Sequence, residues 1–155
     1  GVLDASFSGN VVHYNGGGDQ SIKLPESSYF NLAVSTGGTK TLTANIDVDG
    51  GIGIGAGSIL DVGAGNYSIN LAGDWNNLGT FNEGSGTLIL DGTNDQNITG
   101  AETFYNLTFT NSSDLYINKQ SVKFLYVTLL ILFVDFVLFQ HIICIDLIGS
   151  VNKTH

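Results

Sequence analysis

The residue types that could carry out chemistry lie mostly in glycine-rich segments of the chain. Residues 51–56 satisfy the spacing G-x-G-x-x-A, which in dinucleotide-binding proteins lets the backbone approach a pyrophosphate. That mechanism requires a helix N-terminus directly after the glycines, whereas residues 58–62 alternate like a strand. We therefore interpret residues 51–56 as a glycine-rich corner and expect no nucleotide or other cofactor.

Two pairs of aspartates have the oxygen ligands that calcium prefers, namely Asp47 with Asp49 and Asp91 with Asp95. The first pair opens like an EF-hand loop, but Ile52 occupies the sixth position, where that loop requires glycine. We predict no dedicated metal site and interpret these carboxylates as solvated turn residues. Adventitious calcium at either pair is the alternative.

The pattern of residues gives little support to a hydrolytic site. His13 is the only histidine before residue 141, and it lies in an alternating run that reads as a strand. The chain has no arginine, and its acids are scattered among turns rather than clustered. We predict no catalytic residues and a protein that is not an enzyme, with a polysaccharide-cleaving β-helix as the alternative.

Aromatic side chains offer one candidate ligand surface. Trp75, Tyr29 and Tyr105 could stack against sugar rings if they share an exposed face. In the aromatic pairs at 29–30 and 104–105, one ring of each pair must point out of its strand. We prefer the competing interpretation, in which these rings pack at corners of the fold or between neighbouring molecules.

Short alternating runs separated by turn residues position all of these groups. Glycine, asparagine and aspartate fill the intervals, and these residues tolerate the positive φ angles of tight turns. No window in residues 1–118 has the apolar periodicity of a helix. The pattern predicts an all-β fold, with strand-like runs at residues 11–14, 21–24, 30–34, 41–48, 58–62, 67–71, 87–90 and 104–109.

Part of the chain repeats itself. Residues 14–22 match residues 90–98 at an offset of 76, and residues 29–34 match residues 104–109 at an offset of 75. A single coil has too few apolar side chains to bury a core, whereas stacked coils align them into continuous internal rows. We predict a parallel β-helix, or β-solenoid, with several coils in each repeat of about 75 residues. Stacked β-sandwich repeats are the alternative.

Residues 70–82, 84–93, 96–100 and 103–108 carry a recognisable pattern of order and spacing. They resemble the repeat of large bacterial secreted and cell-surface proteins of the adhesin, hemagglutinin and autotransporter-passenger kind. The resemblance covers roughly residues 9–118. It implies a β-solenoid stalk exported to the cell surface, and it implies no catalytic residues.

Composition limits the partners. Asp and Glu number 14 against five Lys, a formal net charge of −9, and phosphate contacts are made chiefly by Arg and Lys. We therefore predict no nucleic-acid binding. The expected partners are neighbouring repeats or other copies of the chain bound through the coil ends, with surface glycans as a further candidate. The single cysteine, Cys144, permits no disulfide within the chain.

Composition changes after residue 118. Glycine is absent from residues 101–148, and residues 124–148 are almost continuously apolar. We divide the chain into a repeat region, 1–118, and an apolar tail, 119–155. The tail is interpreted as a membrane anchor through 124–148, as the product of a reading-frame slip, or as strands or a cap buried at the end of the solenoid. An aspartate at position 135 disfavours the anchor, because an unpaired intramembrane carboxylate is costly.

The leading functional hypothesis is a non-enzymatic structural or adhesive segment of an exported bacterial surface protein, located outside the cell or at its surface. One alternative is a carbohydrate-binding or polysaccharide-cleaving β-helix fragment. Another is a self-assembling extracellular fibre subunit.

Overall fold

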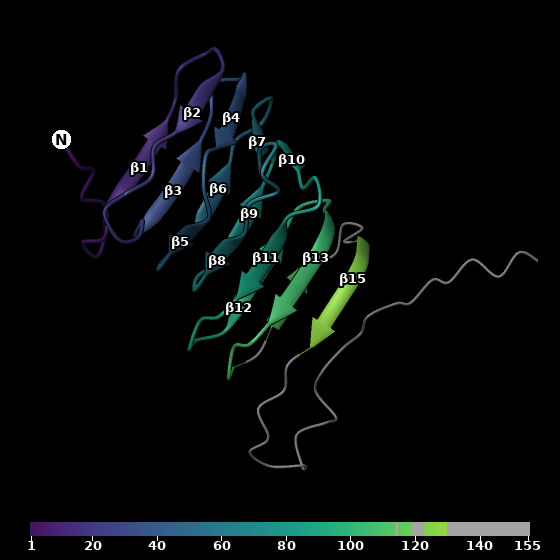
Figure 1. Cartoon of the computed structure of the whole chain (residues 1–155). Coiled ribbons are helices and arrows are strands. Elements are labelled where there is room, and N and C mark those ends of the chain that lie inside the picture. The colour runs from purple at the N-terminus through teal and green to yellow at the C-terminus, as the bar shows by residue number, and fades with distance from the viewer. Residues whose placement is uncertain (114, 119–122, 130–155) are drawn as a thin grey trace, which may run out of the picture.

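The computed structural model describes residues 1–113, 115–118 and 123–129, and these residues form a parallel β-solenoid of about five turns (Figure 1). Three sheets surround one core. Sheet 1 contains β1 (Val11–Tyr14), β3 (Asn31–Val34), β6 (Ile52–Ile54), β9 (Trp75–Asn77), β12 (Gln96–Thr99) and β14 (Leu115–Asn118). Sheet 2 contains β2 (Gln20–Ile22), β4 (Thr39–Leu42), β7 (Ile59–Asp61) and β10 (Thr80–Asn82). Sheet 3 contains β5 (Ile46–Val48), β8 (Ile69–Leu71), β11 (Thr87–Leu90), β13 (Thr103–Phe109) and β15 (Lys123–Leu129).

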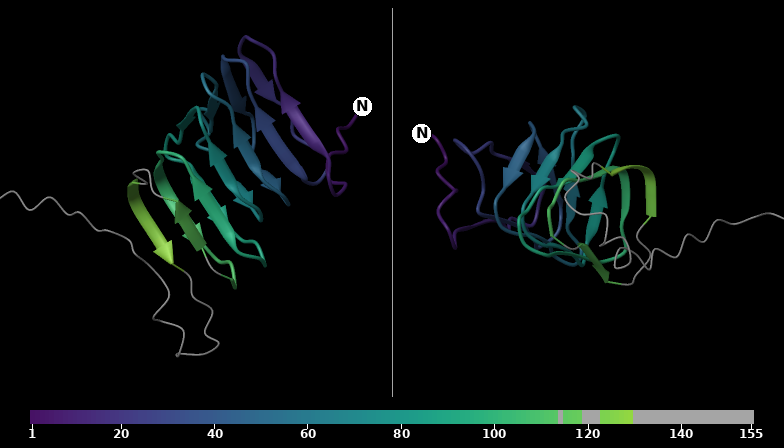
Figure 2. Two further views of the ribbon diagram at one scale, coloured as in Figure 1. Left: turned by 180° about the vertical axis from the view of Figure 1, so that it is seen from behind. Right: turned by 90° about the horizontal axis from the view of Figure 1, so that it is seen from below.

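The chain visits the three sheets in turn, and every strand pair is parallel. Leu32 lies beside Ile52, which lies beside Trp75, so these coils advance by 20 and 23 residues. Two further views show the coils stacked along one axis (Figure 2). The predicted all-β solenoid is confirmed. Sandwiches of paired hairpins, the alternative, would contain antiparallel pairs.

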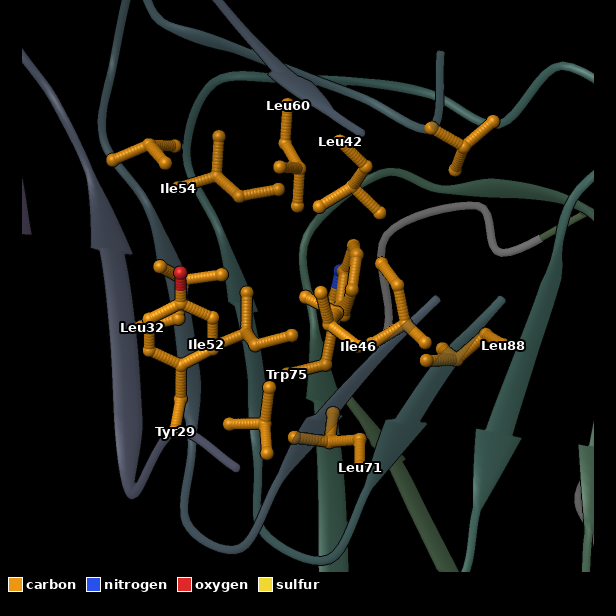
Figure 3. Close-up of a cluster of buried hydrophobic side chains, with 14 of the residues drawn as sticks. Tyr29, Leu32, Leu42, Ile46, Ile52, Ile54, Leu60, Leu71, Trp75 and Leu88 are labelled. Carbon is orange, nitrogen blue, oxygen red and sulfur yellow. The ribbon is translucent and has the colours of Figure 1, made fainter. Parts of the chain in front are cut away.

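Alternating burial explains why these sequences form strands. In β5 and β9 the outer two residues are buried and the middle one is exposed. The row Leu32, Ile52, Trp75 and Ile98 is stacked in register and at most 2% exposed. Figure 3 shows such side chains from all three sheets meeting in the interior. Each coil thus buries apolar area chiefly against its neighbours along the axis.

The two similar sequence segments form the same corner in different places. Gly16 N donates to Gln20 Oε1 at 3.1 Å, and Gly92 N donates to Gln96 Oε1 at 3.2 Å. The first corner joins β1 of sheet 1 to β2 of sheet 2, whereas the second joins β11 of sheet 3 to β12 of sheet 1. The offset of 76 therefore relates two corner motifs that lie on different edges of the solenoid.

Three segments differ from the sequence-based interpretation. Residues 41–48, predicted as one strand-like run, are divided between β4 of sheet 2 and β5 of sheet 3. Residues 51–56, interpreted as a corner, contain the strand β6, and the following strand is β7, so the helix that a dinucleotide site needs is absent there. Strand β15 continues sheet 3 beside β13 and places residues 123–129, the start of the apolar run, in the solenoid. The rest of the proposed anchor lies outside the described residues. Among those described, no helix is long and apolar enough to span a membrane.

Candidate functional site

Two of the three aromatic residues predicted for glycan stacking are in the core. Trp75 and Tyr29 are 0% exposed, so neither ring can meet a sugar at the surface. Tyr105, on β13, is partly exposed. The prediction that Trp75 and Tyr29 stack against sugars at the surface is therefore wrong. Their rings are large enough to fill the interior of a coil. The free energy gained by burying the rings exceeds the cost of removing their polar atoms from water.

An aromatic cluster occupies the core near the end of sheet 2. The ring centroids of Trp75 and Phe81 are 4.8 Å apart, and those of Trp75 and Phe104 are 5.6 Å apart, both in edge-to-face geometry. Trp75 Nε1 donates to Glu102 Oε1 at 3.0 Å. The cluster is held by these ring contacts and by the buried hydrogen bond, which satisfies the indole N–H.

Glu102 is the described carboxylate most withdrawn from water, with 2% exposure. Burial raises the pKa of its carboxyl, hydrogen bonds from Trp75 and Asn77 oppose that shift, and the Glu83 carboxylate adds to it. Sequence reasoning missed this residue, because Glu102 and Trp75 are 27 positions apart. Their proximity could be predicted only from knowing which residues of successive coils lie beside one another.

The outer side of sheet 3 brings three carboxylates near one another. Burial raises the pKa values of Asp47 and Asp91, and the neighbouring Asp49 raises both further. Ser28 Oγ donates to Asp49 Oδ2 at 2.6 Å. The grouping contains the first predicted calcium pair, Asp47 with Asp49, and adds Asp91, which was predicted to pair with Asp95. Within the residues that the structure describes, no group of three or more His, Cys, Asp or Glu side chains could hold a metal ion.

His13 and Ser35 form a pair that resembles a base and a nucleophile. His13 Nε2 lies 2.7 Å from Ser35 Oγ, on the outer face of sheet 1. A catalytic pair needs a third group that orients the base, and no carboxylate in the described part of the chain hydrogen-bonds to His13. The described contacts of His13 therefore comprise two members of such an arrangement, without the third.

Buried polar side chains instead fill the glycine corners. Lys40 is 0% exposed, and its Nζ donates to the carbonyl oxygens of Gly16, Gly18 and Gly37 at 2.8, 2.7 and 2.6 Å. Gly38 has φ of +66°, and a Cβ there would collide with the carbonyl of Gly18. The ammonium thus joins two stacked corners that leave no room for side chains.

Gln96 has the same role in the corner between sheets 3 and 1. Its Nε2 donates to the carbonyls of Leu71 and Gly73 at 2.8 and 2.7 Å. Its Oε1 accepts from Gly92 N and from Asn111 Nδ2, the latter at 2.7 Å. One buried amide therefore links three successive coils.

Comparison with known proteins gives no matching family model, no matching curated protein and no matching solved structure.

Proposed function

We propose that this chain is a structural, non-enzymatic segment of an exported bacterial surface protein, in which the solenoid acts as a stiff spacer or adhesive stalk. The observation that carries the proposal is that hydrogen bonds of the backbone and of buried side chains join successive coils. Backbone ladders run through three sheets, and the corner carbonyls are bound by Lys40 and Gln96. A net charge of −9 favours solubility of such a rod outside the cell.

Single-molecule pulling on the full chain tests the mechanical part of the proposal. A coil of about 20 residues releases ~7 nm when it is stretched, at ~3.5 Å per residue. We expect force peaks separated by about this length, because each coil is held by its neighbours. A chain that extends smoothly at low force, without discrete peaks, would contradict the role of a stiff spacer. Protease treatment of intact cells that carry the parent protein tests the surface location.

One observation favours a second candidate, association through coil ends. Val2, Phe7, Val11 and Leu24 are 50–75% exposed, and all belong to the first coil or to the segment that leads into it. Val12 and Tyr14, whose row is buried in β3, are only partly buried in β1. This end therefore presents apolar surface and a strand edge suited to another coil, from the parent protein or from a second copy.

A further inference from the structure

Sheet 2 ends inside the solenoid. Its last strand is β10, whereas sheets 1 and 3 continue with β12, β14, β13 and β15 (Figure 1). In the coil after β10, only residues 100–102 join β12 to β13, where earlier coils contain a strand of sheet 2. Within the described residues, β10 is therefore an edge strand although other coils follow it.

The backbone of this edge has free hydrogen-bonding capacity at Phe81. Thr80 N donates to Ser58 O at 3.0 Å, and Asn82 O accepts from Val62 N at 3.1 Å, so both residues face β7. Because these groups alternate in direction along a strand, the N–H and C=O of Phe81 face the opposite side. No residue in the described ranges hydrogen-bonds to them. Unpaired groups of this kind recruit extended chains.

Apolar surface adjoins the free edge. Phe81 continues the inward row of Leu60, which is 0% exposed, yet Phe81 itself is only partly buried. Leu78, at the corner before β10, is 76% exposed. A strand added beside β10 would cover both side chains and would extend sheet 2 by the same contacts that join β7 to β10.

The surroundings of the edge are acidic. Glu83 directly follows β10, and Asp61, on the neighbouring strand β7, accepts a hydrogen bond from Asn82. The lysines with described side chains, Lys23 and Lys40, belong to the first two coils. A basic segment is therefore the complementary partner, whereas a second copy would bring an equally acidic edge.

We propose that the β10 edge binds an extended segment of a partner protein as an added strand. The segment places an apolar residue beside Phe81 and a lysine or arginine, two positions further on, beside Glu83. Main-chain hydrogen bonds supply the attachment, and the two side chains supply the selectivity. This inference is independent of the proposed role as a spacer.

The test uses the full isotope-labelled chain and a capped seven-residue peptide with isoleucine at its third and lysine at its fifth position. We expect saturable amide shifts confined to residues 78–83 and slower hydrogen exchange at the Phe81 amide. Glu83→Gln should weaken binding about two- to fivefold, the scale of one exposed ion pair. Glu26→Gln, which removes an exposed carboxylate from the first coil, should leave binding unchanged. A peptide N-methylated at the isoleucine should lose most of its affinity.

Three results would overturn the proposal. The first is the absence of shifts at millimolar peptide. The second is equal binding of a peptide with glutamate in place of lysine, which would remove the charge argument. The third is a Phe81 amide that is already protected from hydrogen exchange in the chain without peptide. In that case sedimentation identifies what covers the edge. A monomer would mean that the chain's own residues pair with β10, and a dimer would mean that a second copy does.

Discussion

At the scale of single residues, the polar side chains buried in this solenoid are explained by its corners. Tight turns rich in glycine present backbone carbonyls to side chains that are themselves buried. Lys40 and Gln96 meet these carbonyls with donors that no apolar residue has. In the described residues, no buried side-chain nitrogen or oxygen lacks a partner. Polar burial is therefore part of the architecture and does not indicate a reactive site.

Gln96→Leu should destabilise the chain by about 2–4 kcal/mol, because it removes four hydrogen bonds that are buried or partly buried, to Gly92 N, Leu71 O, Gly73 O and Asn111 Nδ2. Urea unfolding measures the loss. Gln20→Leu is the matched control, since the partly buried Gln20 makes the corresponding bond to Gly16, and its loss should cost about 1 kcal/mol. Equal losses in the two variants would argue against the three-coil link.

Stability should fall as the pH rises through the raised pKa of Glu102. A raised pKa means that the folded chain holds the proton more tightly than the unfolded chain. The contribution is therefore fully present below the ordinary carboxyl pKa and is lost above the raised one. Asp47 and Asp91 act with the same sign.

Glu102→Gln keeps an acceptor for Trp75 without the charge, so its unfolding free energy should decline less over this pH range. Urea unfolding at several pH values checks this. Glu83→Gln, at a partly exposed position, should change the pH slope much less. A Glu102→Gln profile parallel to that of the original chain would show that Glu102 is not the group responsible.

At the scale of elements, strand β13 places neighbouring aromatic side chains on opposite faces, one in the core and one toward solvent. Phe104 is 1% exposed and packs on Trp75 and Phe81, while Tyr105, the next residue, is partly exposed. The sequence predicted that one ring of this pair points outward, because strands alternate. It could not say which ring, because a shift of one residue in register exchanges the two faces.

Phe104→Ala should cost about 3–5 kcal/mol, through lost burial and the cavity left between two rings. Tyr105→Ala should cost less than about 1 kcal/mol, because that side chain already meets solvent. Thermal unfolding followed by circular dichroism compares the two directly. A larger loss for Tyr105→Ala would mean that the register of β13 is shifted.

At the scale of the whole molecule, the proposed association through coil ends can be tested at the exposed end of the first coil. Val11 is 57% exposed on the edge strand β1, and a lysine there adds charge where another coil would pack. If the chain self-associates through this end, Val11→Lys should weaken the association at least about tenfold in sedimentation velocity, as expected for a central apolar contact. Ala56→Lys adds the same charge at an exposed corner and should leave association unchanged. Equal effects of the two variants would indicate a non-specific charge effect.

The sequence by itself determined the fold class, because period-two alternation and turn residues are local properties. It also determined that strands must stack, since no coil carries enough apolar side chains to stand alone. Only the tertiary structure decided which residues meet, because successive coils differ in length by a few residues and each difference changes the register. The pairs His13 with Ser35 and Trp75 with Glu102, and the end of sheet 2 at β10, are set by how the coils stack. Contacts between coils are non-local, so no periodicity within one strand can specify them.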